Sequence, residues 1–299
     1  MQSSPKKKEM LGRGALLLTT MIWGTSFVIM KDTLESVPTL WLLAIRFTGA
    51  AALMALFGAR RLKTIDRGYL RGGVRMGICL FVAYILQTYG LVYTTPGKNA
   101  FLTASYCVLV PFLWWFFNRR RPDIYNIAAA VLCFVGMGLV SVQTGFTIGI
   151  GDALTICCGL FYALHIIATA KAAETRDPVL LSMLQFAVAA VLCWIIAPAV
   201  SPFPKQVPAS AWYSIAYLCV VCTGVCFLLQ TVGQKYTPPS AVAVILTLES
   251  VFGTILSVLF YHERLTLRVA SGFALIFVAV LISETKLRFL RREKQEELP

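Results

Sequence analysis

The chain has 299 residues, of which 58% are hydrophobic and only 14% are charged, and its mean hydropathy is +0.74. A soluble domain carries about a quarter charged residues, so this composition excludes an ordinary soluble protein and predicts a protein of the lipid bilayer. The net charge of +13 falls in short loops with no folded soluble face, so nucleic acid is not expected as a partner.

The chain begins with a basic segment that leads directly into an apolar stretch of spanning length. Because no small-residue cleavage pattern follows, we expect this stretch to remain as the first membrane helix. Polar residues and Pro/Gly breaks divide the rest into stretches that are each long enough to cross about 30 Å of hydrocarbon as a helix. The ten predicted spans are 12–31, 38–58, 72–93, 98–118, 124–143, 151–171, 178–200, 210–233, 238–260 and 267–284.

The Lys and Arg residues are unevenly divided between the two sets of loops. Most lie in the N-terminal tail, in the loops on its side and after the last span, whereas the opposite side holds only five: Lys31, Lys98, Lys205, Arg264 and Arg268. Basic loops stay on the cytoplasmic side of a membrane. We therefore predict a multi-pass protein of the cell (inner or plasma) membrane with N- and C-termini in the cytoplasm.

The sequence contains an internal repeat. The run LQTYGLVYTTP at 86–96 recurs as LQTVGQKYTPP at 229–239, a shift of 143, and the first two spans align with the sixth and seventh at a shift of 139. Such duplication is typical of transporter folds. The alignments match Trp23 with Tyr162, Ser26 with His165, Arg46 with Gln185, and Gln87 with Gln230.

Each repeat contains five spans, so the second repeat must enter the membrane from the opposite side. The predicted fold is an all-α membrane protein with ten transmembrane helices, arranged as two inverted five-helix repeats around a central cavity. The repeats comprise residues 1–143 and 144–284, and a basic cytoplasmic tail follows at 285–299. Inverted repeats can exchange two packings, which opens a central site alternately to each side.

Several local motifs carry a family resemblance. They are Trp23-Gly24-Thr25-Ser26-Phe27, Arg46-Phe47, Gly97 to Thr103 followed by Val110-Pro111, Leu248-Glu249-Ser250-Val251-Phe252, and His262-Glu263-Arg264-Leu265. With these motifs the chain resembles the EamA-type ten-helix transporters of the drug/metabolite transporter superfamily over essentially its whole length. Ser250 stands where the family usually has Pro, and His262 where it usually has Gly. The resemblance implies substrate transport, with export commoner than import.

Two charged residues fall near the middle of predicted spans. Arg46 lies midway along its span, where a charge is costly unless it is paired or faces a wet cavity. Its planar guanidinium group suits a carboxylate or phosphate ligand. A structural role, in which the guanidinium bonds to helix-end carbonyls or pairs with an acidic neighbour, fits the sequence equally. Glu249 is a candidate proton carrier, a possible partner of Arg46, or a structurally hydrogen-bonded carboxylate.

Polar and aromatic side chains inside other spans complete the candidate site. The paired Gln87 and Gln230 either line a central site or join helices by hydrogen bonds. His165 couples protons, lines the cavity, or is a hydrogen-bonded packing residue between helices. Deep aromatic residues can surround an organic molecule or serve as interfacial anchors. The substrate-binding candidates are Trp23, Ser26, Arg46, Tyr84, Gln87, Tyr106, Tyr162, His165 and Gln230, and the proton-coupling candidates are Glu249 and His165.

The remaining motifs exclude several kinds of chemistry. The nine cysteines fall inside apolar segments without metal-ligand spacing, so neither a metal nor a cofactor is predicted. No GxxxxGK[ST] run is found, so transport energy must come from a gradient.

We predict that the protein is not an enzyme but a secondary active transporter that works by alternating access. Its predicted substrate is a small organic metabolite, such as an amino acid or a related compound, which we expect to be exported. We expect a monomer or a weak homodimer. Proton coupling and uncoupled exchange both fit. The alternative is a membrane-embedded lipid-processing enzyme or a lipid scramblase.

Overall fold

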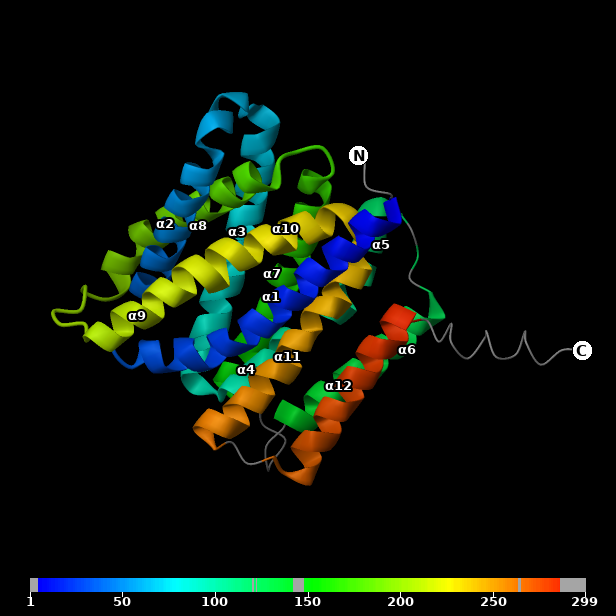
Figure 1. The fold of residues 1–299 in the computed structure, drawn as a ribbon. Helices are drawn as coiled ribbons and strands as arrows, with labels where there is room; N and C mark the ends of the chain where they lie inside the picture. Colours follow the sequence, from blue (N-terminus) through cyan, green and yellow to red (C-terminus); the bar gives the residue numbers. More distant parts are fainter. Residues whose placement is uncertain (1–4, 120, 122, 142–147, 263–264, 286–299) are drawn as a thin grey trace, which may run out of the picture.

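The computed structural model describes residues 5–119, 121, 123–141, 148–262 and 265–285, and these form one helical bundle (Figure 1). The predicted tail beyond residue 285 lies outside the described residues. The elements are α1 (Pro5–Leu34), α2 (Thr39–Gly58), η1 (Ala59–Thr64), α3 (Arg67–Tyr93), α4 (Pro96–Thr103), α5 (Tyr106–Asn118), α6 (Ile124–Ser141), α7 (Ile150–Ala173), α8 (Pro178–Val200), α9 (Ala209–Tyr217), η2 (Leu218–Val225), α10 (Cys226–Tyr236), α11 (Pro239–Tyr261) and α12 (Leu267–Thr285).

Among the described residues these elements make the ten predicted crossings. Eight crossings are long and apolar enough to span a membrane, with α4 and α5 forming one of them and α9, η2 and α10 another. The other two are α6 and α12, whose apolar stretches are shorter, at 127–136 and 267–279. These two helices pack on each other at one side of the bundle (Figure 1). The prediction of an all-helical, ten-crossing membrane protein is confirmed.

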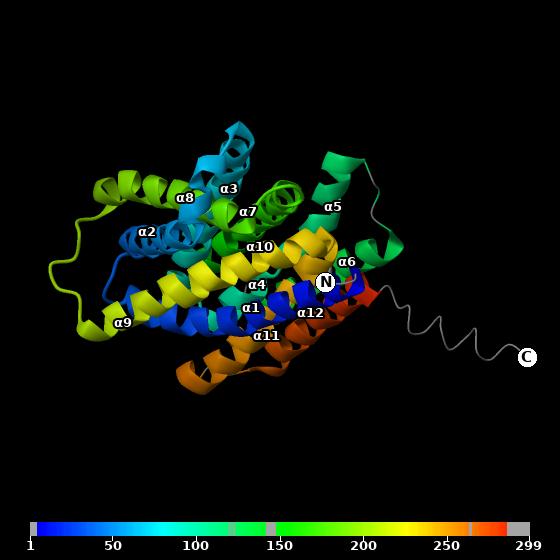
Figure 2. The same cartoon turned by 45° about the horizontal axis from the view of Figure 1, so that its top comes forward.

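The two halves interleave as a two-fold axis requires. Helix α2 packs on α8, its counterpart in the second repeat, and α6 packs on its counterpart α12. Helix α3 packs on α7, and the repeat-related pair, α10 and α1, also pack on each other. Figure 2 shows the same interleaving from a second direction. Because the main helix contacts join one repeat to the other, the centre of the bundle is built by both repeats.

Small residues allow the closest of these contacts. At Gly24 in α1 a Cβ atom would lie 2.4 Å from the Cβ of Phe252 in α11, so only glycine permits this approach. Gly14 in the same helix has no atom within 4 Å of its Cβ position. The opening motif of the sequence therefore contains a glycine required for packing between the two repeats.

Two predicted spans are not continuous α-helices. The span predicted at 98–118 turns at Ala104 and Ser105, where the amide of Ser105 donates to the carbonyl of Leu102 at 3.1 Å. A Cβ on Gly159 of α7 would clash with the Oγ of Ser105, so glycine at this position lets α7 of the second repeat approach the turn. The span predicted at 210–233 contains the π-helical segment η2, in which Thr223 donates its hydroxyl to the carbonyl of Leu218 at 2.7 Å.

Candidate functional site

A cavity lies at the centre of the bundle, where helices of both repeats meet. Its free volume is about 30 Å³, which holds only one or a few waters. Fourteen residues line it: Trp23, Ser26, Phe27 and Met30 of α1, Arg46 of α2, Tyr84 and Gln87 of α3, Tyr106 of α5, Tyr162 and Ile166 of α7, Phe227 and Gln230 of α10, and Leu246 and Glu249 of α11. The described conformation therefore has no free space for an organic molecule at its centre.

The cavity wall follows the internal repeat. Ten of the fourteen residues form five pairs that the sequence shifts of 139 or 143 relate: Trp23 with Tyr162, Phe27 with Ile166, Tyr84 with Phe227, Gln87 with Gln230, and Tyr106 with Glu249. Such pairs are expected in the wall of a cavity on the axis between inverted repeats. The repeat relation thus identifies Phe227 and Ile166, which the candidate set omitted, as counterparts of Tyr84 and Phe27.

The guanidinium of Arg46 is the positive group of the cavity, and its residue is 1% exposed. Its Nε donates to the hydroxyl of Thr223, its Nη2 to the hydroxyl of Tyr84 at 3.2 Å, and its Nη1 to the thioether of Met30 at 3.5 Å. Among the described residues no carboxylate lies within 4 Å of it. A guanidinium has five N–H groups, and these contacts use three. Arg46 is therefore an unpaired charge with donors to spare.

The carboxyl group of Glu249 lies on the same cavity, from the other repeat. Its residue is 5% exposed, and one of its oxygens accepts a hydrogen bond from the hydroxyl of Tyr106 at 3.3 Å. The alternative in which Glu249 pairs with Arg46 is not seen among the described residues, where Arg46 bonds to neutral groups. A single neutral donor compensates a buried charge poorly, so this carboxyl is suited to gain a proton or a positive ligand.

The two cavity amides differ in how fully they are bonded. Gln87 donates its Nε2 to Thr103 at 3.1 Å and accepts from the hydroxyl of Tyr162 at 2.7 Å. Gln230 is buried, and its Oε1 has no hydrogen-bond partner among the described residues. A buried unbonded acceptor costs free energy until a ligand supplies a donor. The second repeat thus contributes an open acceptor to the cavity.

Aromatic rings fill the space between these polar groups. The ring centroids of Trp23 and Phe227 are 4.9 Å apart, and that of Tyr84 lies 5.9 Å from the ring of Tyr162. The indole of Trp23 is fixed by a hydrogen bond from its Nε1 to the carbonyl of Cys222 at 2.7 Å. Ser26 donates its hydroxyl to the carbonyl of Trp23 at 2.7 Å, within its own helix. The cavity therefore offers a rigid apolar wall beside charged groups.

His165 does not line this cavity, contrary to its place among the candidates. It is 1% exposed, its Nε2 lies 2.7 Å from the Oε1 of Gln185, and its ring packs edge-on against Phe227 at 5.8 Å between centroids. Gln185 is the repeat counterpart of Arg46. His165 thus contacts the cavity residue Phe227 without lining the cavity itself, and its role in proton coupling stays a prediction.

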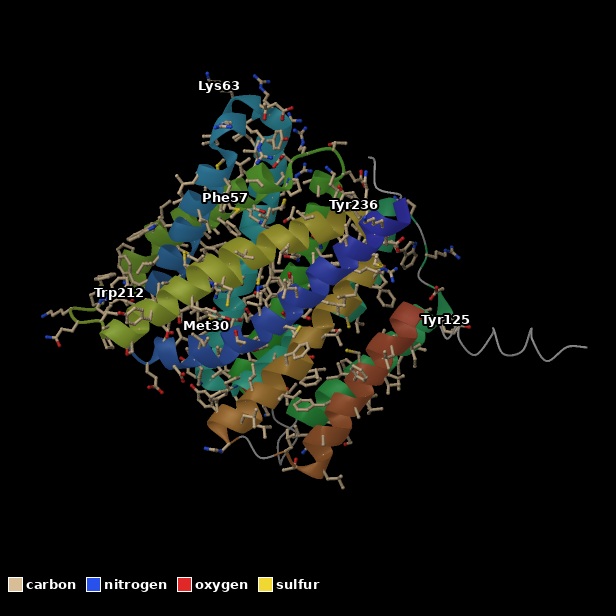
Figure 3. All side chains as sticks on the ribbon, viewed as in Figure 1. Met30, Phe57, Lys63, Tyr125, Trp212 and Tyr236 are labelled. Atoms are coloured by element: carbon tan, nitrogen blue, oxygen red, sulfur yellow. The ribbon has the colours of Figure 1, made fainter. Side chains whose placement is uncertain are left out.

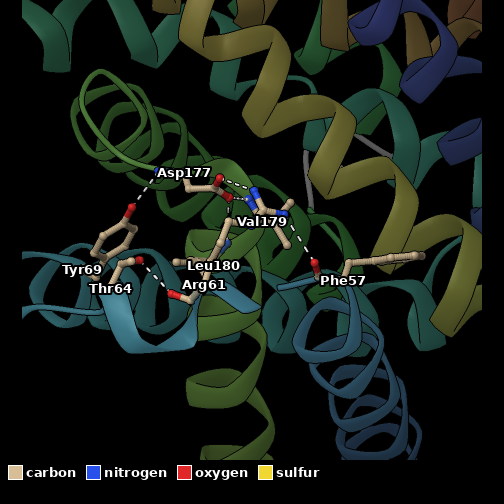
Figure 4. A network of polar contacts seen from close by, with 7 residues as sticks. All are labelled: Phe57, Arg61, Thr64, Tyr69, Asp177, Val179 and Leu180. Carbon is tan, nitrogen blue, oxygen red and sulfur yellow. Dashed lines mark hydrogen bonds and ion pairs between the residues drawn. The ribbon is translucent and has the colours of Figure 1, made fainter. Parts of the chain in front are cut away.

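At one end of the bundle the first repeat contacts the start of α8 (Figure 4). Arg61 of η1 forms an ion pair with Asp177, whose carboxylate also accepts from the backbone N–H of Val179 at 2.8 Å. The backbone N–H of Asp177 donates to the hydroxyl of Tyr69 at 3.0 Å. The same carboxylate therefore caps a helix of one repeat and anchors the α2–α3 connection of the other.

A second ion pair accompanies it. Arg176 binds Asp66 at 2.6 Å and stacks over the ring of Tyr69 at 4.7 Å. Asp66 caps α3 by accepting from the backbone N–H of Tyr69 at 2.8 Å, and this bond, together with Arg176, holds the pKa of its carboxyl below the ordinary value. The end of the bundle beside the α2–α3 connection is thus closed by two contacts between the repeats.

The opposite end is held by a buried carboxylate. Asp152 at the start of α7 pairs with Lys98 of α4 at 3.4 Å and accepts from the hydroxyl of Thr94 at 2.7 Å. Beside it, the ammonium of Lys31 donates to the carbonyls of Leu91 and Thr94 at 2.6 and 3.1 Å, where α3 ends. Polar contacts between the repeats are therefore present at both ends of the bundle.

Comparison with known proteins gives the same architecture. A model of the EamA-like transporter family matches the chain twice, over residues 10–142 and 149–285. A relative from Archaeoglobus fulgidus, named an uncharacterized transporter, is 31% identical over 271 residues, which cover 89% of this chain and 83% of the relative. A biotin transporter of Salmonella typhimurium is 21% identical, over 83% of this chain and 85% of its own. A solved structure with 18% identity has the same fold, with a TM-score of 0.72 over 96% of this chain and 99% of that one.

Proposed function

Because the chain belongs to the EamA-like transporter family, we propose that it is a secondary active transporter that moves a small organic metabolite through the central cavity by alternating access. The observation that carries this proposal is Arg46, a buried guanidinium that has spare donors and no carboxylate partner among the described residues. An unpaired buried charge is costly, so a functional ligand is its best explanation. The cavity serves transport, not a reaction.

The polar groups of the cavity favour an amino acid or a related compound. A carboxylate fits the spare donors of Arg46, and an amine or N–H group fits the open acceptor of Gln230 and the carboxyl of Glu249. The aromatic wall suits an apolar body. Biotin, which the Salmonella relative is named for, also combines a carboxylate, N–H groups and an apolar portion.

The size and symmetry of the cavity support alternating access. A free volume of about 30 Å³ is smaller than any such substrate, so the helices must part before it enters. The repeat-related wall allows the same parting at either end. The contacts of Asp177 and Asp66 would break when one end opens, and those of Asp152 when the other opens.

Orientation and energy source complete the proposal. The basic residues of the α2–α3 connection support a multi-pass cell-membrane protein with this end of the bundle and both termini in the cytoplasm, because basic loops stay on the cytoplasmic side. Glu249 carries the proton that couples transport to the proton gradient. The direction is export, which the family resemblance favours, and substrate moves outward as protons move in.

The first experiment measures thermal stabilisation of the detergent-purified chain across amino acids, biotin, nucleobases, sugars and lipophilic cations. A ligand that binds only the folded protein raises its melting temperature. We expect a selective shift with a carboxylate-bearing compound, followed by transport of that compound in proteoliposomes. Stabilisation by cations alone would contradict the role of Arg46. Lipid flipping in protein-containing vesicles without substrate transport would favour a scramblase.

A further inference from the structure

A second hollow lies between α3, α5 and α7, away from the central cavity and at the end that carries the α2–α3 connection. Its volume is about 590 Å³, far larger than the central cavity. Four cations line it: Arg71 and Arg75 of α3, Lys171 of α7, and Arg176 beyond α7. None of its lining residues is acidic. The groove is therefore a concentrated positive site that transport through the centre does not explain.

The cations differ in how they are compensated. Arg176 is paired with Asp66, and the ammonium of Lys171 lies over the ring of Phe117 at 5.1 Å. Arg71 and Arg75 are exposed, and no carboxylate of the described residues lies within 4 Å of either. Because they are four residues apart, both project from one face of α3. An anion in the groove would find at least two uncompensated guanidinium groups.

The rest of the groove is apolar. Beyond the cations it is walled by Cys79, Phe117, Leu164, Ile167 and alanine residues of α7, all within membrane-crossing helices. Phe117 is 48% exposed, so the groove borders the surface that faces lipid. A positive end at the membrane edge, continuous with an apolar trough inside the membrane, has the shape and polarity of a bound phospholipid.

We propose that this groove binds an anionic phospholipid of the adjacent leaflet, with its phosphate between Arg71, Arg75 and Lys171 and an acyl chain along α7. A free phosphate would leave the apolar trough empty. Basic residues also retain loops in the cytoplasm, but that role requires no groove and is shared by loop cations such as Lys63 at the tip of the connection (Figure 3).

The test is native mass spectrometry of the detergent-purified full chain with phosphatidylglycerol, with phosphatidylcholine of the same acyl chains, and with inorganic phosphate. A nearby cation strengthens binding of an anionic lipid about fivefold, so Arg71→Gln with Arg75→Gln should weaken phosphatidylglycerol binding about 25-fold. The control, Arg60→Gln with Lys63→Gln, removes the same charge at the same end but outside the groove and should leave binding unchanged.

Three results would overturn the proposal. They are an equal loss in the control, equal affinity for the two lipids, and binding of inorganic phosphate as tight as that of phosphatidylglycerol, which would indicate a soluble anion. Lys171→Gln alone provides an independent variant on another helix, should the double substitution impair production. It is expected to weaken phosphatidylglycerol binding about fivefold and to leave phosphatidylcholine binding unchanged.

Discussion

Substitution of Arg46 by Gln distinguishes a ligand-binding arginine from a structural one. Arg46→Gln removes the charge and the guanidinium fork but retains a polar side chain. The two unused N–H groups can form two charge-assisted hydrogen bonds with a carboxylate, each worth about 1.5 to 3 kcal/mol. Loss of about 3 kcal/mol in total corresponds to roughly 150-fold weaker binding.

Arg46→Gln should weaken ligand binding without lowering the thermal stability of the protein. The charge of Arg46 is buried without a carboxylate partner among the described residues, so its removal relieves an unfavourable term. We expect Arg46→Gln to melt at the parent's temperature or above it in the absence of ligand. If Arg46 instead held the helices together, the same change would lower the melting temperature while sparing the affinity of any remaining folded protein.

The assay is binding of the compound found in the ligand panel, measured by calorimetry on purified protein. Arg46→Lys keeps the charge but loses the fork and should bind with intermediate affinity. Arg13→Gln makes the same chemical change in the exposed ion pair with Glu9 on α1 and serves as the control. The reasoning is refuted if folded Arg46→Gln binds the carboxylate compound within threefold of the parent.

Three further outcomes are expected. Glu249→Gln should abolish proton-driven transport and spare counterflow, measured in proteoliposomes, and loss of both would indicate a structural role. Gly24→Ala should destabilise the protein by about 1 to 3 kcal/mol because the new methyl group meets Phe252, whereas Gly14→Ala should be neutral or stabilising; equal melting temperatures would contradict the packing argument. Asp66 has a lowered pKa, so its stabilising effect is present above pH about 4 and is lost as the pH falls through its folded-state value. Asp66→Asn should therefore make the melting temperature less dependent on acidification, and an unchanged dependence would refute this.

The sequence was sufficient to predict the ten crossings, the inverted repeats and the family, and all three are confirmed. The repeat carried most of this information, because equivalent residues of inverted halves that lie close to the axis face the same central space. Gln87 and Gln230 were selected on that ground, and both line the cavity. Their part in substrate binding stays a prediction.

The composition of the sequence did not predict the local backbone geometry of two spans. The turn at Ser105 and the π-helical segment at Thr223 lie inside predicted spans, whose composition indicates a crossing but not its hydrogen-bond register. Thr223 reaches Arg46 from that segment, so a neighbour of the main candidate was missed. One departure from the family pattern did carry structural information. His262 follows α11 with φ of 50°, a left-handed conformation for which glycine is the usual residue.

The distribution of charge between the repeats links substrate charge to proton coupling. The first repeat contributes Arg46 and the second Glu249. Exchange of substrate for a proton requires that Glu249 carries a proton in the empty cavity and that the substrate displaces it. A zwitterionic amino acid can do so, because its carboxylate neutralises Arg46 and its ammonium neutralises the ionised carboxyl of Glu249. A monoanion neutralises only Arg46, and because a net buried charge is costly, Glu249 must then keep its proton. We therefore expect about one proton to be released when a zwitterion binds and none when a monoanion such as biotin binds, as recorded by a pH indicator in weakly buffered solution. Equal proton release for both would mean that Glu249 does not share the binding site.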